Sequence, residues 1–181
     1  MFKLCRIFIL FLAGMGVLLP NVQAASRQEI DVKVQAAVSS FYRASLPGKK
    51  LAQQAVGMLV FPEVYKAGFG IGGEYGEGAL LRGGRTQGYY NLVSASIGFQ
   101  LGAQVKSEVI LFMTQAALNQ FINSDGWEAG VDGSVAVATL GVGGEIDTHT
   151  AQQPIIGFIF SNKGLMYNLS IEGAKISPIA R

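Results

Sequence analysis

The sequence predicts an α+β fold: a single domain with a curled antiparallel sheet, or a partial β-barrel, of short glycine-rich strands. Glycine-interrupted apolar stretches fill most of the chain after residue 55. Each glycine in a helix would cost about 1 kcal/mol relative to alanine, so these stretches favour extended structure. An amphipathic pattern before them predicts an N-terminal helix, and a second short pattern predicts one internal helix. Charged residues are sparse and no proline- or serine-rich linker divides the chain, which favours one domain.

Residues 1–24 are typical of a secretory signal peptide. Lys3 and Arg6 form a positive start, Ile7 to Leu19 an apolar run, and Val22-Gln23-Ala24 a cleavage site. The apolar run has about 13 residues, whereas a membrane-spanning helix needs about 20. Cys5 precedes the run and does not lie at the cleavage site, so no lipoprotein anchor is predicted. We therefore expect an exported domain of residues 25–181, periplasmic or secreted, which can lie peripherally on a membrane.

The net charge changes when this segment is removed. The full chain has 14 Lys and Arg against 12 Asp and Glu, a net charge of +2. Without Lys3 and Arg6, 12 residues of each sign remain and the domain is neutral. A neutral domain has no overall field that would attract nucleic acid, so a nucleic-acid partner is not predicted. The mature chain also has no cysteine, which excludes disulfides and thiol chemistry.

The first predicted element is a helix over residues 27–45. Ile30, Val34, Val38 and Phe41 fall on one face of it, and Pro47-Gly48 is expected to end it. Two roles stay open for this helix: it packs on the core of the domain, or it lies in the headgroup region of a membrane.

A short second helix is predicted over residues 49–54. It starts with Lys49 and Lys50, which are the most closely spaced basic residues of the mature chain. Together with Lys66, Arg82 and Arg85, these lysines are candidates for an anion-binding face. A solvated turn is the alternative.

Nine apolar or β-branched runs predict strands, and turn residues such as Gly83-Gly84 separate them. The runs span residues 56–61, 67–75, 78–82, 88–93, 96–104, 107–113, 134–142, 155–161 and 164–172. Residues 114–123 predict the internal helix, with Thr114 as its N-cap. Gly70 to Glu74 and Gly141 to Glu145 share the pattern Gly-x-Gly-Gly-Glu, which would suit two strands that cross with closely packed backbones.

Catalytic and cofactor motifs find little support. Gly68-x-Gly70-x-x-Gly73 matches a dinucleotide fingerprint, but no helix pattern follows it. Glu74 and Glu77 would point to opposite faces of a strand, and His149 is the single histidine. We therefore predict a protein that is not an enzyme and has no cofactor or metal site. Trp127, between Gly126 and Glu128, is the candidate for an exposed aromatic anchor.

Four strings of the sequence resemble the SYLF domain, also called the Ysc84 or DUF500 family, over residues 45–176. They are VFPEVYKAGFGIGGEYGEGALL, GFQLGAQ, GWEAGVDGS and GLMYNLSIEG. The resemblance implies a lipid-binding module, here of the bacterial cell envelope, with a phospholipid or membrane surface as its partner. Apolar contacts would come from near Phe41 and Trp127, and cations from Lys49, Lys50, Lys66, Arg82 and Arg85. The alternative is an envelope structural or stress-related protein that binds another protein and no lipid.

Overall fold

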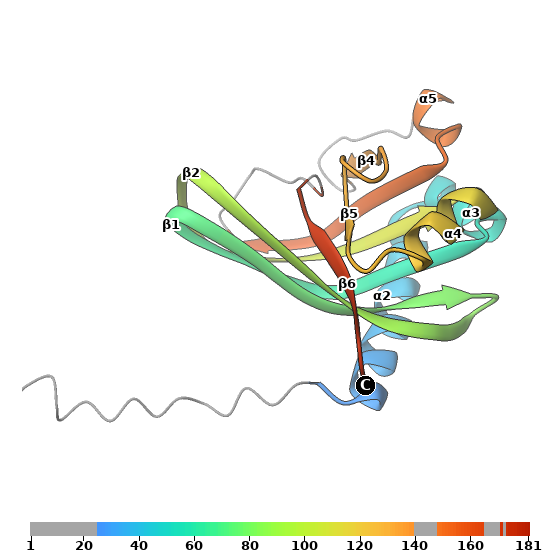
Figure 1. The fold of residues 1–181 in the computed structure, drawn as a ribbon, viewed down its shortest axis with the longest axis horizontal. Coiled ribbons are helices and arrows are strands. Elements are labelled where there is room, and N and C mark those ends of the chain that lie inside the picture. The colour runs from blue at the N-terminus through green and yellow to red at the C-terminus, as the bar shows by residue number, and fades with distance from the viewer. Residues whose placement is uncertain (1–24, 140–147, 165–170, 172) are drawn as a thin grey trace, which may run out of the picture.

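The computed structural model of the chain describes residues 25–139, 148–164, 171 and 173–181 (Figure 1). Over these residues the chain has four helices and six strands, which confirms the α+β fold with a curled sheet. The predicted signal peptide, the Gly141 to Glu145 pattern and most of the predicted strand 164–172 lie outside the described residues. None of the described helices is long and apolar enough to cross a bilayer.

Two helices open the domain. Helix α2 spans Arg27–Ala44 and begins at Ser26, whose hydroxyl accepts a hydrogen bond from the backbone N–H of Glu29. Helix α3 spans Leu46–Gln54 and is capped in the same way by Ser45. The prediction that Pro47-Gly48 ends the first helix is wrong, because α2 ends at Ala44 and Ser45 separates it from α3. Pro47 lies in the first turn of α3, where its missing N–H costs nothing.

The centre of the fold is a two-stranded antiparallel ribbon. Strand β1 spans Gly57–Arg82 and β2 spans Arg85–Phe112, and they pair along their whole length. The prediction of short strands is wrong here, because each of these strands combines three predicted runs. Register shifts between Phe61 and Val64, and between Phe69 and Ile71, take the place of the expected breaks. Pro62 lies in the first shift, where a missing N–H does not interrupt the pairing.

The ribbon folds back on itself. Figure 1 shows both strands reversing direction at the end of the sheet opposite the helices, and the second shift in register lies at this point. We call this part of the ribbon, residues 64–77 with 91–108, the folded end. The two halves of β1 then approach closely: a methyl group on Gly78 would lie 2.1 Å from the carbonyl oxygen of Val60. Glycine is required there because any side chain would overlap the backbone of the other half.

The remaining elements complete the sheet on the other side of β2. Strand β5 (Ile155–Gly164) pairs with the second half of β2, and β6 (Lys175–Ile179) pairs with its first half. Strand β3 (Trp127–Glu128) pairs with β6, and β4 (Ala136–Thr139) runs parallel to β5, the single parallel pairing among the described strands. Helix α4 (Gln115–Ile122), capped by Thr114, confirms the predicted internal helix, and α5 (Thr148–Ala151) precedes β5.

Hydrophobic residues form a core on each face of the sheet. On the outer face, Ile30, Val34 and Phe41 of α2 pack on β1, β2 and β5. On the inner face, α4 and Trp127 pack on the opposite side of the same strands. Because its apolar residues are buried in the outer core, α2 packs on the domain, and of the two roles left open by the sequence the structure supports the first.

Candidate functional site

The inner face of the folded end carries buried charges. Lys66 Nζ lies 2.9 Å from Glu74 Oε1, and Lys106 Nζ lies 2.9 Å from Glu74 Oε2 and 2.8 Å from Glu108 Oε1. All four side chains are at least nine-tenths buried. Since two lysines face two glutamates, the charges of this cluster balance when all four groups are ionised. We call these four residues the inner charge cluster.

Two members of the cluster have a shifted pKa. Burial raises the pKa of Glu108, and the nearby Lys106 ammonium opposes this only in part. Burial alone would lower the pKa of Lys106, but attraction by Glu108 and Glu74 outweighs it, so this pKa lies above its usual value. Among the described residues, Glu108 Oε2 and both polar atoms of the Gln104 side chain have no hydrogen-bond partner, although both residues are buried. The inner face is thus strongly polar at this end.

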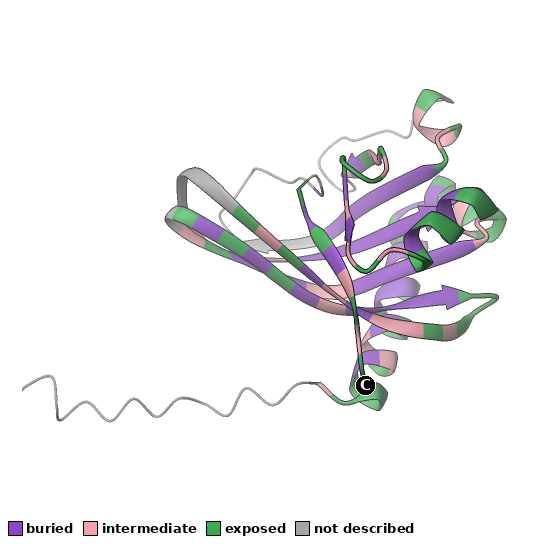
Figure 2. Ribbon diagram, viewed as in Figure 1, coloured by how far each residue is buried: buried purple, intermediate pink, exposed green. Residues whose placement is uncertain are grey.

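The outer face of the folded end has the opposite character. Along β1, exposed residues alternate with buried ones, as Figure 2 shows, and on β2 Val93, Ala95 and Ala103 are exposed. The outward positions pair across the ribbon as Ala67 with Ala103, Gly73 with Ala95, and Tyr75 with Val93. Tyr65 and Ile71 continue the same face, and Ile71 is 71% exposed. We call this surface the outer apolar face; it consists of Tyr65, Ala67, Ile71, Gly73, Tyr75, Val93, Ala95 and Ala103, none of which is charged.

A groove lies beside the outer apolar face, between the start of α2 and β1. It has a volume of about 460 Å³. Its lining includes Tyr65 and Tyr75 of the outer apolar face together with Glu29, Lys33, Glu63, Glu77 and Arg181.

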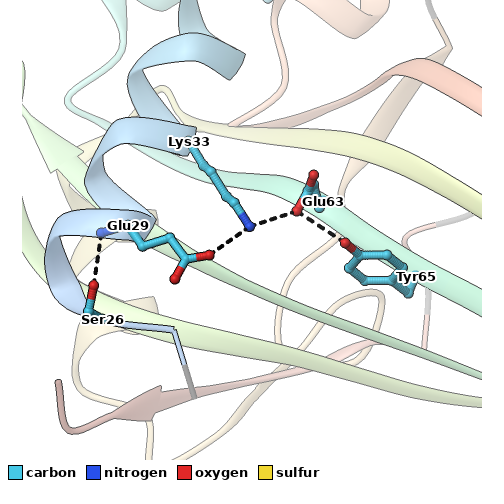
Figure 3. Close-up of polar contacts among 5 residues, drawn as sticks. All are labelled: Ser26, Glu29, Lys33, Glu63 and Tyr65. Atoms are coloured by element: carbon cyan, nitrogen blue, oxygen red, sulfur yellow. Dashed lines mark hydrogen bonds and ion pairs between the residues drawn. The ribbon is translucent and has the colours of Figure 1, made fainter. Parts of the chain in front are cut away.

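Ion pairs connect the walls of this groove. Figure 3 shows Lys33 reaching from α2 between two carboxylates, with its Nζ 3.0 Å from Glu29 Oε1 and 3.1 Å from Glu63 Oε2. Hydrogen bonds to these carboxylates raise the pKa of Lys33.

The two tyrosines of the groove each donate a hydrogen bond to a neighbouring carboxylate. The hydroxyl of Tyr65 donates to Glu63 at 3.1 Å, and that of Tyr75 donates to Glu77 at 2.6 Å. Burial and the bond to Glu77 raise the pKa of Tyr75 to about 12. Arg181 pairs with Glu77 at the end of the chain. The groove therefore presents two aromatic rings among charges of both signs.

The structure corrects three of the predicted lipid-binding residues. Trp127 is only 1% exposed, because it packs edge-on against Phe121 of α4 in the inner core, so the prediction of an exposed anchor is wrong. Phe41 of α2 is fully buried, and its ring packs against Phe158 and Phe160 of β5. Lys66 is buried in the inner charge cluster, where it pairs with Glu74. None of the three offers a surface for a lipid.

The other four predicted cations are exposed. Lys49 and Lys50 lie on α3, with the Lys49 ammonium 5.8 Å from the centre of the Tyr42 ring. Arg82 and Arg85 pair across the turn that joins β1 to β2, where Gly83 and Gly84 have positive φ angles. The pairs thus lie on different elements, and their role in lipid binding stays a prediction.

The carboxylates and the histidine lie apart from one another. Glu74 faces inward and Glu77 outward, as the strand period predicts. His149 is exposed on α5, where its ring nitrogens lie near the Gln153 side-chain amide. Within the described part of the chain, no group of three His, Cys, Asp or Glu side chains is placed to hold a metal ion.

Sequence reasoning missed the inner charge cluster. Gln104, Lys106 and Glu108 alternate with Val105, Ser107 and Val109, so their spacing alone places three long polar side chains on one face of a strand. The apolar residues before and after this segment predict an apolar strand, so the polar side chains on one face of it were overlooked.

One comparison with known proteins gives a match. A search among curated proteins found no significant relative. The family model Ysc84, described as "Las17-binding protein actin regulator", matches residues 93–180. This range begins within β2 and includes every later element, whereas the long string that starts at Val60 lies before it. Residues 93–180 are therefore identified as a Ysc84 (SYLF) domain, as the sequence resemblance predicts.

Proposed function

We propose that the chain is a peripheral lipid-binding protein whose membrane contact is the outer apolar face. The observation that supports this most strongly is the reversed polarity of the folded end, where four charged side chains are buried inside, and the eight residues of the outer apolar face are uncharged, with Glu77 at their edge. A half-exposed sheet in water normally has the reverse pattern, with polar residues facing solvent. Exposed apolar patches with a polar rim are typical of surfaces that contact a membrane or a partner.

The composition of the face suits the boundary between headgroups and acyl chains. Tyrosine is enriched at that depth because its ring is apolar and its hydroxyl is polar. Tyr65 and Tyr75 line the charged groove, Val93 lies directly across from Tyr75, and Ile71 is exposed further along the same face. The tyrosines and Val93 would therefore lie at headgroup level, with Ile71 deeper.

This mode of binding depends little on net charge. The mature domain is neutral, and the four exposed cations that the sequence predicts for lipid binding lie away from the outer apolar face, Lys49 and Lys50 on α3 and Arg82 and Arg85 at the β1–β2 turn. Apolar burial is not screened by salt, whereas attraction between exposed charges is. We expect vesicle binding to persist at moderate salt and in a Lys49→Glu/Lys50→Glu variant.

A vesicle-flotation experiment on residues 25–181 tests the proposal. Ile71→Asp would place a charge in the centre of the outer apolar face and should weaken binding about tenfold or more, since burying an isoleucine is worth about 1.5–3 kcal/mol. Val131→Asp is the matched control, because Val131 is 72% exposed and Ile71 is 71% exposed. Equal binding by the two variants would contradict the proposal.

We further propose that the protein acts in the bacterial cell envelope. The support is the charged start, apolar run and small-residue cleavage site of residues 1–24. Expression of the full chain with mass measurement of the product should show a mature protein that begins at or near Ala25. A product that keeps residues 1–24 would contradict export with cleavage.

The family description favours one alternative, because it names a protein partner, Las17, and an actin regulator. In that case the outer apolar face would bind an envelope protein. Complete absence of binding to vesicles of either neutral or anionic lipid would favour this alternative over lipid.

A further inference from the structure

The groove beside the outer apolar face has the size and the chemistry of a headgroup site. Its volume of about 460 Å³ lies within the usual range of small-molecule pockets, roughly 300–1,000 Å³. Tyr65 and Tyr75 belong both to the groove and to the outer apolar face. A lipid whose chains lie along that face would therefore have its headgroup at the groove.

The charges of the groove select against a purely anionic headgroup. Three carboxylates line it, from Glu29, Glu63 and Glu77, against the two cations Lys33 and Arg181. Lys33 is already shared between two carboxylates, at 3.0 and 3.1 Å, and Arg181 pairs with Glu77. The charged side chains of the lining thus carry one negative charge in excess, which disfavours a headgroup whose charge is a phosphate alone.

The same lining suits a headgroup that carries a positive nitrogen. Ammonium groups are attracted to tyrosine rings, and this attraction is used widely in the recognition of choline. Glu63 and Glu77 lie beside the two tyrosines, to which their carboxylates are hydrogen-bonded, so ring and negative charge occur together twice. Lys33 and Arg181 lie in the same groove and would face the phosphate of the same headgroup.

We propose that this groove binds the headgroup of a zwitterionic phospholipid, of the phosphocholine or phosphoethanolamine class. The ammonium end lies against Tyr65, Tyr75 and the carboxylates of Glu63 and Glu77, and the phosphate lies against Lys33 and Arg181. This inference rests on the proposed function and adds the class of lipid to it.

The test compares vesicles of phosphatidylcholine with vesicles of phosphatidylglycerol. The wild-type domain should bind phosphatidylcholine more tightly. A Glu63→Gln/Glu77→Gln variant keeps the size of both side chains but removes the charge that holds the ammonium. It should lose about tenfold in affinity for phosphatidylcholine and little for phosphatidylglycerol. An Asp125→Asn/Glu128→Gln variant, which removes two negative charges outside the groove, should bind as the wild type does.

Each outcome separates this inference from the proposed function. Wild-type binding to phosphatidylglycerol that equals or exceeds binding to phosphatidylcholine would overturn the lipid class and leave the outer apolar face as the membrane contact. Unchanged phosphatidylcholine binding by the Glu63→Gln/Glu77→Gln variant would overturn the groove as its site. If soluble phosphocholine bound as tightly as the vesicles do, a membrane lipid would be the wrong source. Failure of every vesicle to bind would instead overturn the proposed function itself.

Discussion

The two ends of the β1–β2 ribbon differ in how they distribute polarity. Where α2 covers it, the ribbon is apolar on both faces, with Val60 and Val109 in the outer core and Leu59 and Ile110 in the inner core. At the folded end the inner face carries Lys66, Glu74, Lys106 and Glu108, while the outer apolar face is uncharged and exposed, and Glu77 lies at its edge. The same pair of strands is thus apolar on both faces at one end, and at the other end it carries charges on its inner face and apolar residues on its outer face.

The difference shows that the two ends are stabilised in different ways. The covered end gains from burial of hydrocarbon, at about 25 cal/mol per Å². The folded end has to compensate for the desolvation of four charges, which it does by direct pairing within 3 Å. Such pairing contributes little net stability, but it makes each member intolerant of losing its partner.

The largest effect is therefore expected from Lys106→Met, which removes the cation shared by Glu74 and Glu108. Two buried carboxylates would lose a partner at 2.8–2.9 Å, and breaking a buried pair costs about 3–5 kcal/mol. Urea unfolding followed by circular dichroism measures this loss. Lys50→Met, at an exposed lysine of α3, should stay within about 0.5 kcal/mol of the wild type. Similar stabilities for the two variants would show that the inner charge cluster does not hold the folded end.

A smaller effect separates the two faces of β1 directly. Gly78 faces inward against the Val60 carbonyl oxygen at 2.1 Å, and Gly73 faces outward with its nearest such contact at 3.4 Å. Gly78→Ala should lower the free energy of unfolding by about 1–3 kcal/mol or more, because backbone has to move to make room. Gly73→Ala should be nearly neutral. Thermal unfolding of both variants checks the difference, and equal losses would contradict the close approach of the two halves.

Glu108 gives the inner charge cluster a pH dependence. Burial raises its pKa in the folded protein above 4.5, the value expected after unfolding. The folded state therefore holds this proton more tightly, so its contribution to stability declines as pH rises from 4.5 through the folded pKa. Glu108→Gln lacks this decline. Between about pH 4 and about pH 8, the urea midpoint of the variant should rise relative to that of the wild type as pH increases. A difference that does not change with pH would contradict the raised pKa.

The smallest effect concerns a single proton at the edge of the outer apolar face. Burial and the hydrogen bond to Glu77 raise the pKa of Tyr75 to about 12, from an ordinary value of 10.0. Alkaline titration of tyrosinate absorbance should show a late phase that disappears in Tyr75→Phe. In Glu77→Gln this phase should move to lower pH, because the carboxylate that disfavours the tyrosinate is gone. A late phase that Glu77→Gln leaves unchanged would assign the shift to burial alone.

Much of the fold was predictable from local patterns. Ile30, Val34, Val38 and Phe41 predict α2 because a packed helix needs one apolar stripe, and Thr114 predicts the start of α4 because it can cap a free N–H. The lengths of β1 and β2 were not predictable. Glycine and Pro62 indicate interruptions in a sequence, whereas a register shift lets paired strands continue through them.

The site was predictable only where it depends on the strand period. The opposite orientations of Glu74 and Glu77 follow from alternation. The burial of Trp127 and Lys66 does not, because Trp127 is buried by packing on Phe121 of α4 in the inner core, and Lys66 pairs with Glu74 across the fold in the ribbon. Surface exposure of a single aromatic residue or cation is a tertiary property, and nothing in the flanking residues encodes it.

The tight turn at Gly83 and Gly84 also sets an order of events during folding. Pairing can start at Arg82 with Arg85 and extend outward one residue at a time, because each added pair closes only a small further loop. Helix α2 packs on β5 as well as on β1 and β2, and β5 follows it by more than a hundred residues, so complete docking of α2 requires contacts of high sequence separation. Pulsed hydrogen exchange during refolding should therefore protect the amides around the turn before those of α2. The protein would assemble its proposed membrane-binding ribbon first and cover the other end of it last.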